Sequence, residues 1–251
     1  MDRTIWSKRI YKNSCPAWPC KVCNAGVLKL VANSLTFEET ESSKREHDDE
    51  AWDPDWIDFA FTAWAQCSNE SCTQKYALSG VGGVEQQYTY GEEHEWDWFE
   101  YFVPKYCYPM PQVVIIPKKC PDEVSAPLRA SFSLFYNDLG SCAGKIRVAL
   151  ERLMDHVSID THRTTKSGKQ QRLQLHERIE KYAAHEKVLA NHLLAIKWLG
   201  NTAIHELTNI SRDDLLDAYE IIEHTLTEII DQRSARIAQL ASRLEQRHAP
   251  K

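Results

Sequence analysis

Residues 20–26 read Cys20-Lys21-Val22-Cys23-Asn24-Ala25-Gly26, and residues 67–72 read Cys67-Ser68-Asn69-Glu70-Ser71-Cys72. Each stretch places two thiols a few positions apart. In the first, Asn24 and Gly26 favour a tight knuckle that directs both sulfur atoms at one ion. Two such pairs complete a tetrahedral site of the structural type, with no position left for water. We therefore expect one structural Zn²⁺ per chain, held by Cys20, Cys23, Cys67 and Cys72.

Cys15 offers an alternative ligand set. It is separated from Cys20 by four residues, as Cys67 is from Cys72, so it competes with Cys23 for the ion. The two-residue gap between Cys20 and Cys23, followed by Gly26, favours Cys23. Free cysteines also occur as small buried hydrophobic residues. That packing role is expected for the cysteines without a partner at knuckle spacing, which are Cys107, Cys120 and Cys142.

The N-terminal residues indicate the compartment. Met1-Asp2-Arg3-Thr4-Ile5-Trp6-Ser7-Lys8 has no apolar segment behind its charges, so no secretion signal is evident. We expect a cytoplasmic protein whose thiols stay reduced, which favours metal binding over disulfides. No apolar run reaches the ~18 residues that a membrane span needs. We therefore expect no membrane partner.

Charge and residue types divide the chain into two parts. Residues 1–123 carry 12 Lys and Arg against 20 Asp and Glu, whereas residues 124–251 carry 18 against 16. The length of 251 residues suffices for two small domains. The net charge of −6 argues against a protein that coats nucleic acid generally, but a local basic site remains compatible with it.

The N-terminal part, residues 1–123, is predicted to be a zinc-ribbon-like β domain. Alternating apolar residues predict strands over residues 27–31, 34–37, 57–65 and 76–78. Gly80, Gly82 and Gly83 are expected to break the last of these strands. Residues 38–55 are rich in carboxylates and are expected to form a solvated insertion. A proline-rich connection closes the domain and contains a predicted short strand at residues 113–116.

The C-terminal part, residues 124–251, shows the apolar period of helices. We expect an antiparallel bundle of four or five helices, which makes the fold class α+β. The first helix is predicted to end at Gly140, and another at Gly200-Asn201. Residues 161–171 are expected to form a loop. A long last helix is predicted to begin after Ser211 and to project beyond the bundle.

Several stretches of this part resemble a known family. They are Ile146-Arg147-Val148-Ala149-Leu150-Glu151, Leu175-His176-Glu177-Arg178-Ile179, the run from Ala195 through Gly200-Asn201-Thr202-Ala203-Ile204-His205, and Asp214-Leu215-Leu216-Asp217-Ala218-Tyr219-Glu220. In order and spacing they resemble the bacterial domain-of-unknown-function family DUF4145, which is similar to the HEPN superfamily of helical bundles. The cysteine pairs look like the zinc-binding front end of many such proteins. The resemblance implies a HEPN-like bundle in a superfamily rich in ribonucleases, toxins and defence proteins.

The resemblance also implies which residues would be catalytic. Active HEPN ribonucleases use an Arg, often followed by Asn, and a His a few residues later, and dimerisation brings two such motifs together. Asn201 and His205 match this motif, but Gly200 stands where the Arg should be. His205 can act as a general acid or base, and Arg147 or Lys197 can face the site. In the structural alternative, Asn201 caps the helix that carries His205, and Arg147 pairs with Glu151.

We therefore expect a non-catalytic, zinc-containing interaction module that binds RNA, DNA or a protein, in bacterial defence or stress response. The alternative is a metal-independent HEPN-type ribonuclease that uses His205 with a basic group from outside the motif. Ile237, Leu240 and Leu244 continue an apolar stripe along the last helix. An exposed stripe of this kind favours a partner surface, so we expect a homodimer.

Overall fold

The computed structural model describes residues 2–89, 95–205 and 210–248, without the side chains of residues 89, 95 and 202–205. The chain divides into two compact units, Asp2–Gln112 and Val113–Lys251. We call them the sheet unit and the helical unit. The division lies N-terminal to the boundary that the sequence suggests after residue 123. The two units together give a mixed α+β protein.

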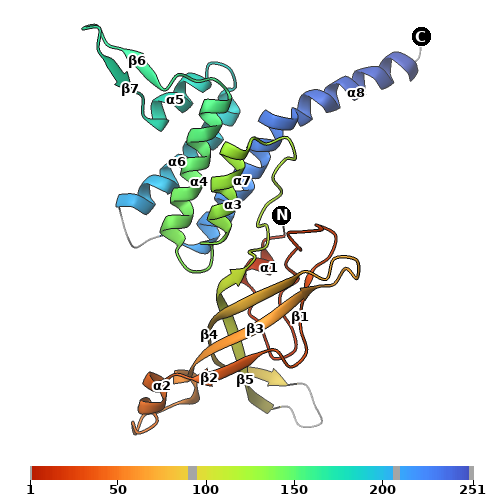
Figure 1. The fold of residues 1–251 in the computed structure, drawn as a ribbon, viewed down its shortest axis with the longest axis vertical. Coiled ribbons are helices and arrows are strands. Elements are labelled where there is room, and N and C mark those ends of the chain that lie inside the picture. Colours follow the sequence, from red (N-terminus) through yellow and green to blue (C-terminus); the bar gives the residue numbers. More distant parts are fainter. Residues whose placement is uncertain (1, 90–94, 206–209, 249–251) are drawn as a thin grey trace. The chain divides into compact units, whose positions relative to one another are not determined.

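The sheet unit is built on one curled antiparallel sheet (Figure 1). Its strands are β1 (Leu28–Leu30), β2 (Thr36–Glu39), β3 (Asp58–Cys67), β4 (Lys75–Thr89) and β5 (Glu95–Tyr108). The strand order is β1-β3-β4-β5, and β2 pairs with the N-terminal half of β3, which β1 does not reach. A short helix, α1 (Thr4–Ser7), precedes the sheet. The sheet is larger than the ribbon expected from the cysteine spacing.

Aromatic side chains pack together on one face of this sheet. Phe102 of β5 is fully buried, and its ring lies 4.9 Å from that of Phe37 and 5.2 Å from that of Phe61, between centroids. Along β3, buried residues alternate with exposed ones, as the two-residue period of a strand requires. The core of the sheet unit therefore lies on one face of β3, β4 and β5.

The prediction that glycines end the strand after residue 78 is wrong, because β4 continues to Thr89. These glycines allow β5 to approach closely. A Cβ on Gly80 would lie 2.3 Å from the carbonyl oxygen of Val103, and one on Gly82 would lie 2.5 Å from that of Tyr101. The pairing shifts register at Ser79/Gly80, where a bulge bends the strand. The glycines therefore shape the sheet and do not interrupt it.

The acidic segment at residues 38–55 contains more regular structure than a solvated insertion would. Helix α2 (Glu41–Glu46) begins after Thr40, whose side chain accepts a hydrogen bond from the Ser43 amide. A 3-10 turn, η1 (Pro54–Trp56), leads into β3. Ser43 is buried, and its hydroxyl donates to Glu39 at 2.7 Å. This contact holds the segment against the end of the sheet.

Within its described residues, the helical unit contains six α-helices and one hairpin (Figure 1). The helices are α3 (Asp122–Phe132), α4 (Leu139–His156), α5 (Leu175–Tyr182), α6 (Lys187–His205), α7 (Arg212–Asp231) and α8 (Arg233–His248). Helices α3, α6 and α7 pack on α4, which carries the buried apolar residues Ile146, Leu150 and Leu153. Leu150 follows Ile146 by four residues and Leu153 follows Leu150 by three, so all three side chains lie on one face of the helix.

One helix end and one strand differ here from the sequence predictions. The first helix ends at Phe132, before Gly140. Asp138 caps the next helix by accepting a hydrogen bond from the Ser141 amide at 2.8 Å. Residues 113–116 form no strand. The Ile115 amide donates to the Glu223 carboxylate of α7 at 2.8 Å. A side chain thus accepts the hydrogen bond that a neighbouring strand would accept in a sheet.

Residues 161–171, predicted as a loop, mostly form an exposed hairpin of β6 (His162–Thr164) and β7 (Gln170–Arg172). Gly168 provides the positive φ of 79° at its turn. The hairpin was missed because none of its strand residues is apolar, so no alternating pattern marks it.

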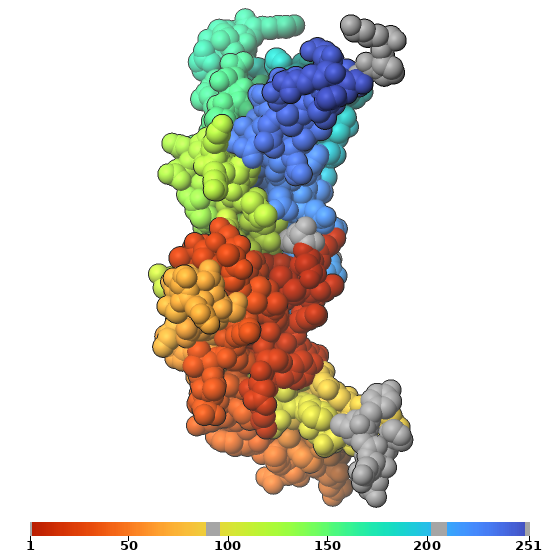
Figure 2. Space-filling view, turned by 90° about the vertical axis from the view of Figure 1, so that its right-hand side faces the viewer, coloured from red at the N-terminus to blue at the C-terminus, as the bar shows by residue number. Residues whose placement is uncertain are grey.

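Helix α8 follows Gln232, whose left-handed backbone separates it from α7. No residue of α8 is buried, and its blue atoms lie open on the surface of the helical unit in Figure 2. In the part of the chain that the structure describes, no helix is both long enough and apolar enough to cross a membrane.

Candidate metal centre

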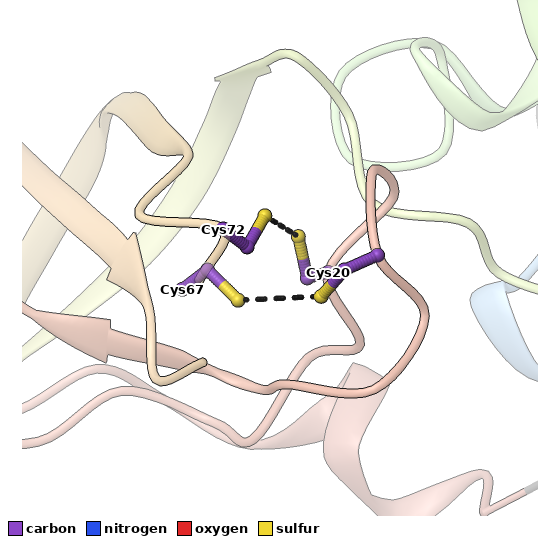
Figure 3. Close-up of side chains that lie close together, drawn as sticks. Cys20, Cys67 and Cys72 are labelled. Atoms are coloured by element: carbon purple, nitrogen blue, oxygen red, sulfur yellow. Dashed lines mark hydrogen bonds between the residues drawn. The ribbon is translucent and has the colours of Figure 1, made fainter. Parts of the chain in front are cut away.

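Two loops bring four thiols together at one end of the sheet. Cys20 and Cys23 lie in the loop before β1, Cys67 is the last residue of β3, and Cys72 lies in the turn before β4. Their Sγ atoms all lie within 4.8 Å of one another. Figure 3 shows Cys20 facing Cys67 and Cys72 across the gap between the loops. The four residues expected from the sequence are therefore the ones that the fold gathers.

Backbone hydrogen bonds close the first loop. The Cys20 amide donates to the Gly26 carbonyl at 2.9 Å, and the Asn24 amide donates to the Cys20 carbonyl at 3.0 Å. Asn24 has the left-handed backbone expected of it, with a φ of 52°. Gly26 has no such backbone but is needed for space, because a Cβ there would lie 2.5 Å from Cys67 Sγ. The glycine thus allows the second loop to approach the first.

The second loop is organised by Asn69. Its carbonyl accepts a hydrogen bond from the Cys72 amide at 2.9 Å, and its side chain accepts one from the Ser71 amide at 3.0 Å. Thr73 then adopts a left-handed backbone with a φ of 48°. The Cys67 amide donates to Gln74 at 2.9 Å and closes the turn. These bonds hold Cys67 and Cys72 on the same side of the loop.

Hydrogen-bond donors surround the sulfur atoms. The amide of Gly26 points at Cys23 Sγ and that of Asn69 at Cys67 Sγ, each at 3.4 Å. The Tyr76 hydroxyl donates to Cys20 Sγ at 3.2 Å and accepts from the Lys21 amide at 2.9 Å. Donors of this kind stabilise thiolates and orient metal ligands. Tyr76 was not singled out in the sequence, where it is one aromatic residue of a strand.

The four thiols differ in how readily they ionise. Hydrogen bonds from the backbone of Ala25 and Gly26 lower the pKa of Cys23 to about 6. Burial raises the pKa of Cys67 to about 12. Burial also acts to raise the pKa of Cys20. Hydrogen bonds from Tyr76 and the backbone outweigh it, so the pKa of Cys20 is lowered. The first loop therefore supplies the thiolates that a cation would meet most readily.

The geometry fits a tetrahedral ion. Sγ of Cys20 lies 3.7 Å from that of Cys72, and Sγ of Cys23 lies 3.6 Å from that of Cys67. A tetrahedron with metal–sulfur bonds of ~2.3 Å has edges of ~3.8 Å. A disulfide would need ~2.05 Å, and all eight cysteines are free. Four sulfur ligands in this arrangement are the donor set typical of structural zinc.

The remaining cysteines lie outside this cluster. The Cys15 thiol donates to the Leu28 carbonyl at 3.5 Å, and burial raises its pKa to about 11. Burial likewise raises the pKa of Cys107 and Cys142 to about 12, and that of Cys120 to about 11. Among the described residues, only Cys20, Cys23, Cys67 and Cys72 form a group of three or more such side chains close enough to share one ion.

The motif residues of the helical unit lie where α4 crosses α6. Helix α6 runs through Gly200 to His205, so the prediction of a break there is wrong, and Asn201 caps no helix. Arg147 of α4 donates to the Asn201 side chain and lies 3.6 Å from the Glu151 carboxylate. A Cβ on Gly200 would lie 3.1 Å from Arg147 Cβ. Gly200 therefore allows α4 and α6 to cross closely, with the Arg147 side chain over it.

Two further residues of α6 belong to the sequence hypothesis. Lys197 is buried, and its Nζ lies 3.3 Å from the centre of the Trp198 ring. Burial lowers its pKa, and the charge of Arg147 lowers it further. The backbone of His205 ends α6, but its side chain lies outside the described part of the structure.

Two families match parts of the chain. The model of one described as a Domain of unknown function (DUF8608) matches residues 8–107, and that of a second, Domain of unknown function (DUF4145), matches residues 129–247. The resemblance of the helical unit to DUF4145 is therefore confirmed over those residues. No curated protein and no solved structure matches the chain.

Proposed function

We propose that the protein is a non-catalytic interaction module whose sheet unit is held together by one structural Zn²⁺. The observation that carries the proposal is the cluster of four thiols within 4.8 Å. The ion would crosslink the loop before β1 to the β3–β4 turn, with all four positions taken by sulfur. A closed site of this kind supplies folding energy and leaves no position for a substrate.

Metal content of the purified protein tests this proposal. The wild type is expected to contain one equivalent of zinc, and the double variant Cys67→Ser/Cys72→Ser to contain none. Cys15→Ser is the matched control, because Cys15 lies outside the cluster and should leave the zinc in place. An iron equivalent in place of zinc, or a metal-free protein with native stability, would overturn the proposal.

The helical unit is proposed to be a HEPN-like bundle without ribonuclease activity. Gly200 offers no guanidinium at the motif position, so no group there can stabilise the charge that develops on a phosphate. Arg147 and Asn201 are hydrogen-bonded to each other and Arg147 also faces Glu151. These bonds support a structural role, in which the two residues join α4 to α6.

One observation favours the alternative of a metal-independent ribonuclease. The Arg147 guanidinium reaches Asn201, beside the position that the motif Arg would occupy. Incubation with single-stranded RNA in EDTA separates the two proposals. We expect no cleavage. Cleavage that disappears in both Arg147→Ala and His205→Ala would establish the ribonuclease.

We also propose that the module is a homodimer that pairs through α8. Ile237, Leu240 and Leu244 follow one side of this helix at spacings of three and four residues, and all three are exposed. Burying apolar surface is favourable by about 25 cal/mol for each Å² removed from water, so covering this stripe would stabilise the protein. Isologous pairing with a second copy is the commonest way to cover such a stripe.

A further inference from the structure

Three aromatic side chains stand exposed on the face of the sheet opposite its core. Trp64 of β3 is 50% exposed, and Tyr106 and Tyr108 of β5 are 62% and 82% exposed. Trp64 alternates with the buried residues Ala63 and Ala65, so it points away from the core. We call Trp64, Tyr106 and Tyr108 the aromatic face. Several exposed apolar side chains on one face mark a candidate interaction site.

The strand register places these rings in neighbouring rows of one face, with only small side chains between them. Trp64 pairs with Ala77, and Ala77 pairs with Tyr108, so one row of the sheet carries a ring at each end and a methyl group in the middle. The next row runs from Thr62 through Ser79 to Tyr106. Strands lie ~4.8 Å apart, so the backbones of Trp64 and Tyr108 are separated by ~10 Å. The only side chain between the two rings in this row is the methyl group of Ala77.

The row on the other side of Trp64 is basic. Lys29 of β1 pairs with Gln66, which pairs with Lys75 of β4, and both lysines are exposed. None of the three rows carries a carboxylate. The acidic residue of β3, Asp58, lies at the far end of the strand, paired with Gly83. The aromatic face is thus bordered by two cations on one side, inside a unit whose overall charge is negative. On the other side, beyond the Thr62 row, lies the exposed Glu38 of β2, which pairs with Ala60.

We propose that this surface binds single-stranded nucleic acid, with bases stacked on the aromatic face and phosphates near Lys29 and Lys75. Stacking on exposed rings beside a basic border is how proteins bind single strands without sequence preference. A duplex keeps its bases stacked on each other, so it cannot offer their faces to these rings. The inference names the partner of the interaction module and rests on that proposed role, but not on the identity of the metal.

The metal centre adjoins this surface. Leu28 pairs with Cys67 one position along the ladder from the Lys29–Gln66 pair. A crosslink between the two cysteine loops would therefore fix the strand ends that carry Lys29 and Lys75. The rings of the aromatic face lie on strands that pair extensively beyond those loops. We expect loss of the metal to weaken the phosphate contacts more than the stacking.

Fluorescence anisotropy with labelled twelve-nucleotide oligo-dT and oligo-U tests the proposal on the full chain. Trp64→Ala and Tyr108→Ala are each expected to weaken binding by about 5-fold or more, and Trp64→Phe to recover most of the loss. Trp96→Ala is the matched control. Trp96 is also exposed on β5, but its pairing with Tyr88 places it on the opposite face.

Salt dependence tests the lysines separately. Two phosphate contacts give a slope of about −1.4 in log K against log salt for a single strand, and Lys29→Glu/Lys75→Glu should abolish that contribution. Lys166→Glu/Lys169→Glu is the charge-matched control, on the β6–β7 turn of the other unit. If that variant loses binding while the aromatic variants keep it, the strand binds the hairpin and the proposal is overturned.

The outcomes distinguish this inference from the proposed zinc module. A zinc-loaded protein that binds neither oligonucleotide overturns the inference and leaves the zinc module standing. A zinc-free protein that binds the oligonucleotides through Trp64 and Tyr108 overturns the zinc module and leaves the inference standing. Preference for duplex DNA, or binding of a neutral oligosaccharide in place of oligonucleotide, also overturns the inference. Selectivity between oligo-dT and oligo-U identifies which nucleic acid is bound.

Discussion

Leu28 and Cys67 are backbone partners in the β1–β3 ladder, and their pairing joins two cysteine loops that lie far apart in the sequence. Cys67 is the last residue of β3, and Leu28 begins β1 directly after the first loop. The Ser68 amide extends the contact by donating to the Val27 carbonyl at 2.8 Å. The β1–β3 ladder therefore places the two cysteine loops side by side at one end of the sheet.

Gly26→Ala should disrupt the metal centre without changing any ligand. The added Cβ would lie 2.5 Å from Cys67 Sγ and 2.9 Å from the Asn69 amide nitrogen, so one loop must move. We expect the free energy of unfolding to fall by about 1–3 kcal/mol, with faster metal release to a chelator. Gly144→Ala in α4 is the control, since nothing lies within 4 Å of its added Cβ. Equal behaviour of the two variants in urea unfolding would contradict the packing argument.

Tyr76→Phe should weaken metal binding while the sheet stays folded. It removes the hydroxyl that donates to Cys20 Sγ and accepts from the Lys21 amide. Loss of such a supporting hydrogen bond typically lowers the metal affinity by about 10- to 100-fold. Competition with a chromophoric chelator measures the change. Tyr108→Phe, at an exposed position outside the centre, should leave the affinity unchanged. A Tyr76→Phe variant with wild-type affinity would rule out this supporting role.

Ser211→Ala should destabilise the helical unit in a pH-dependent way. The Ser211 side chain and backbone donate to Asp214 at 2.7 and 2.8 Å and lower the pKa of that carboxyl. Because the folded pKa is lower than the unfolded value of ~3.9, the stabilisation is complete above that value. It is lost as the pH falls through the folded pKa. We expect a loss of about 1 kcal/mol at pH 7, and a smaller one near pH 3. A loss that does not change with pH would contradict the assignment.

Ile237→Glu/Leu244→Glu should convert the proposed dimer to a monomer. The two glutamates would place charge in the apolar stripe of α8, where pairing would bury it. Light scattering at micromolar concentration should give about twice 29.0 kDa for the wild type and 29.0 kDa for the variant. Ser242→Glu is the control, because Ser242 lies on the opposite side of the helix at 3.6 residues per turn. A wild-type mass of 29.0 kDa would remove the dimer.

The cluster of Cys20, Cys23, Cys67 and Cys72 could be predicted because the spacing within each pair is local. The spacing of Cys20 and Cys23 indicates a knuckle, and the left-handed Asn24 completes it. The role of Gly26 could not be predicted, because it depends on Cys67, which approaches only when β1 pairs with β3. The same applies to Tyr76, whose hydroxyl meets Cys20 across the fold.

Three of the errors in the predicted fold fall at glycines. Gly80, Gly140 and Gly200 were interpreted as ends of elements, because glycine interrupts strands and helices in isolation. At Gly80, the close approach of the Val103 backbone excludes a side chain. At Gly200, a Cβ would press against Arg147. Both contacts come from parts of the chain far away in sequence. At Gly140, the Asp138 cap begins α4 one position earlier. The aromatic face was also missed, because its rows exist only once the strands are in register.

X-ray absorption at the zinc edge tests the central claim most directly, because it reports the ligand atoms themselves. The account predicts one zinc per chain with four sulfur neighbours at about 2.3 Å and no nitrogen or oxygen neighbour. It also predicts that the spectrum of the Cys15→Ser variant is unchanged. Nitrogen or oxygen atoms at about 2.0–2.1 Å, fewer than four sulfurs, or a folded protein without zinc would contradict a closed four-cysteine centre.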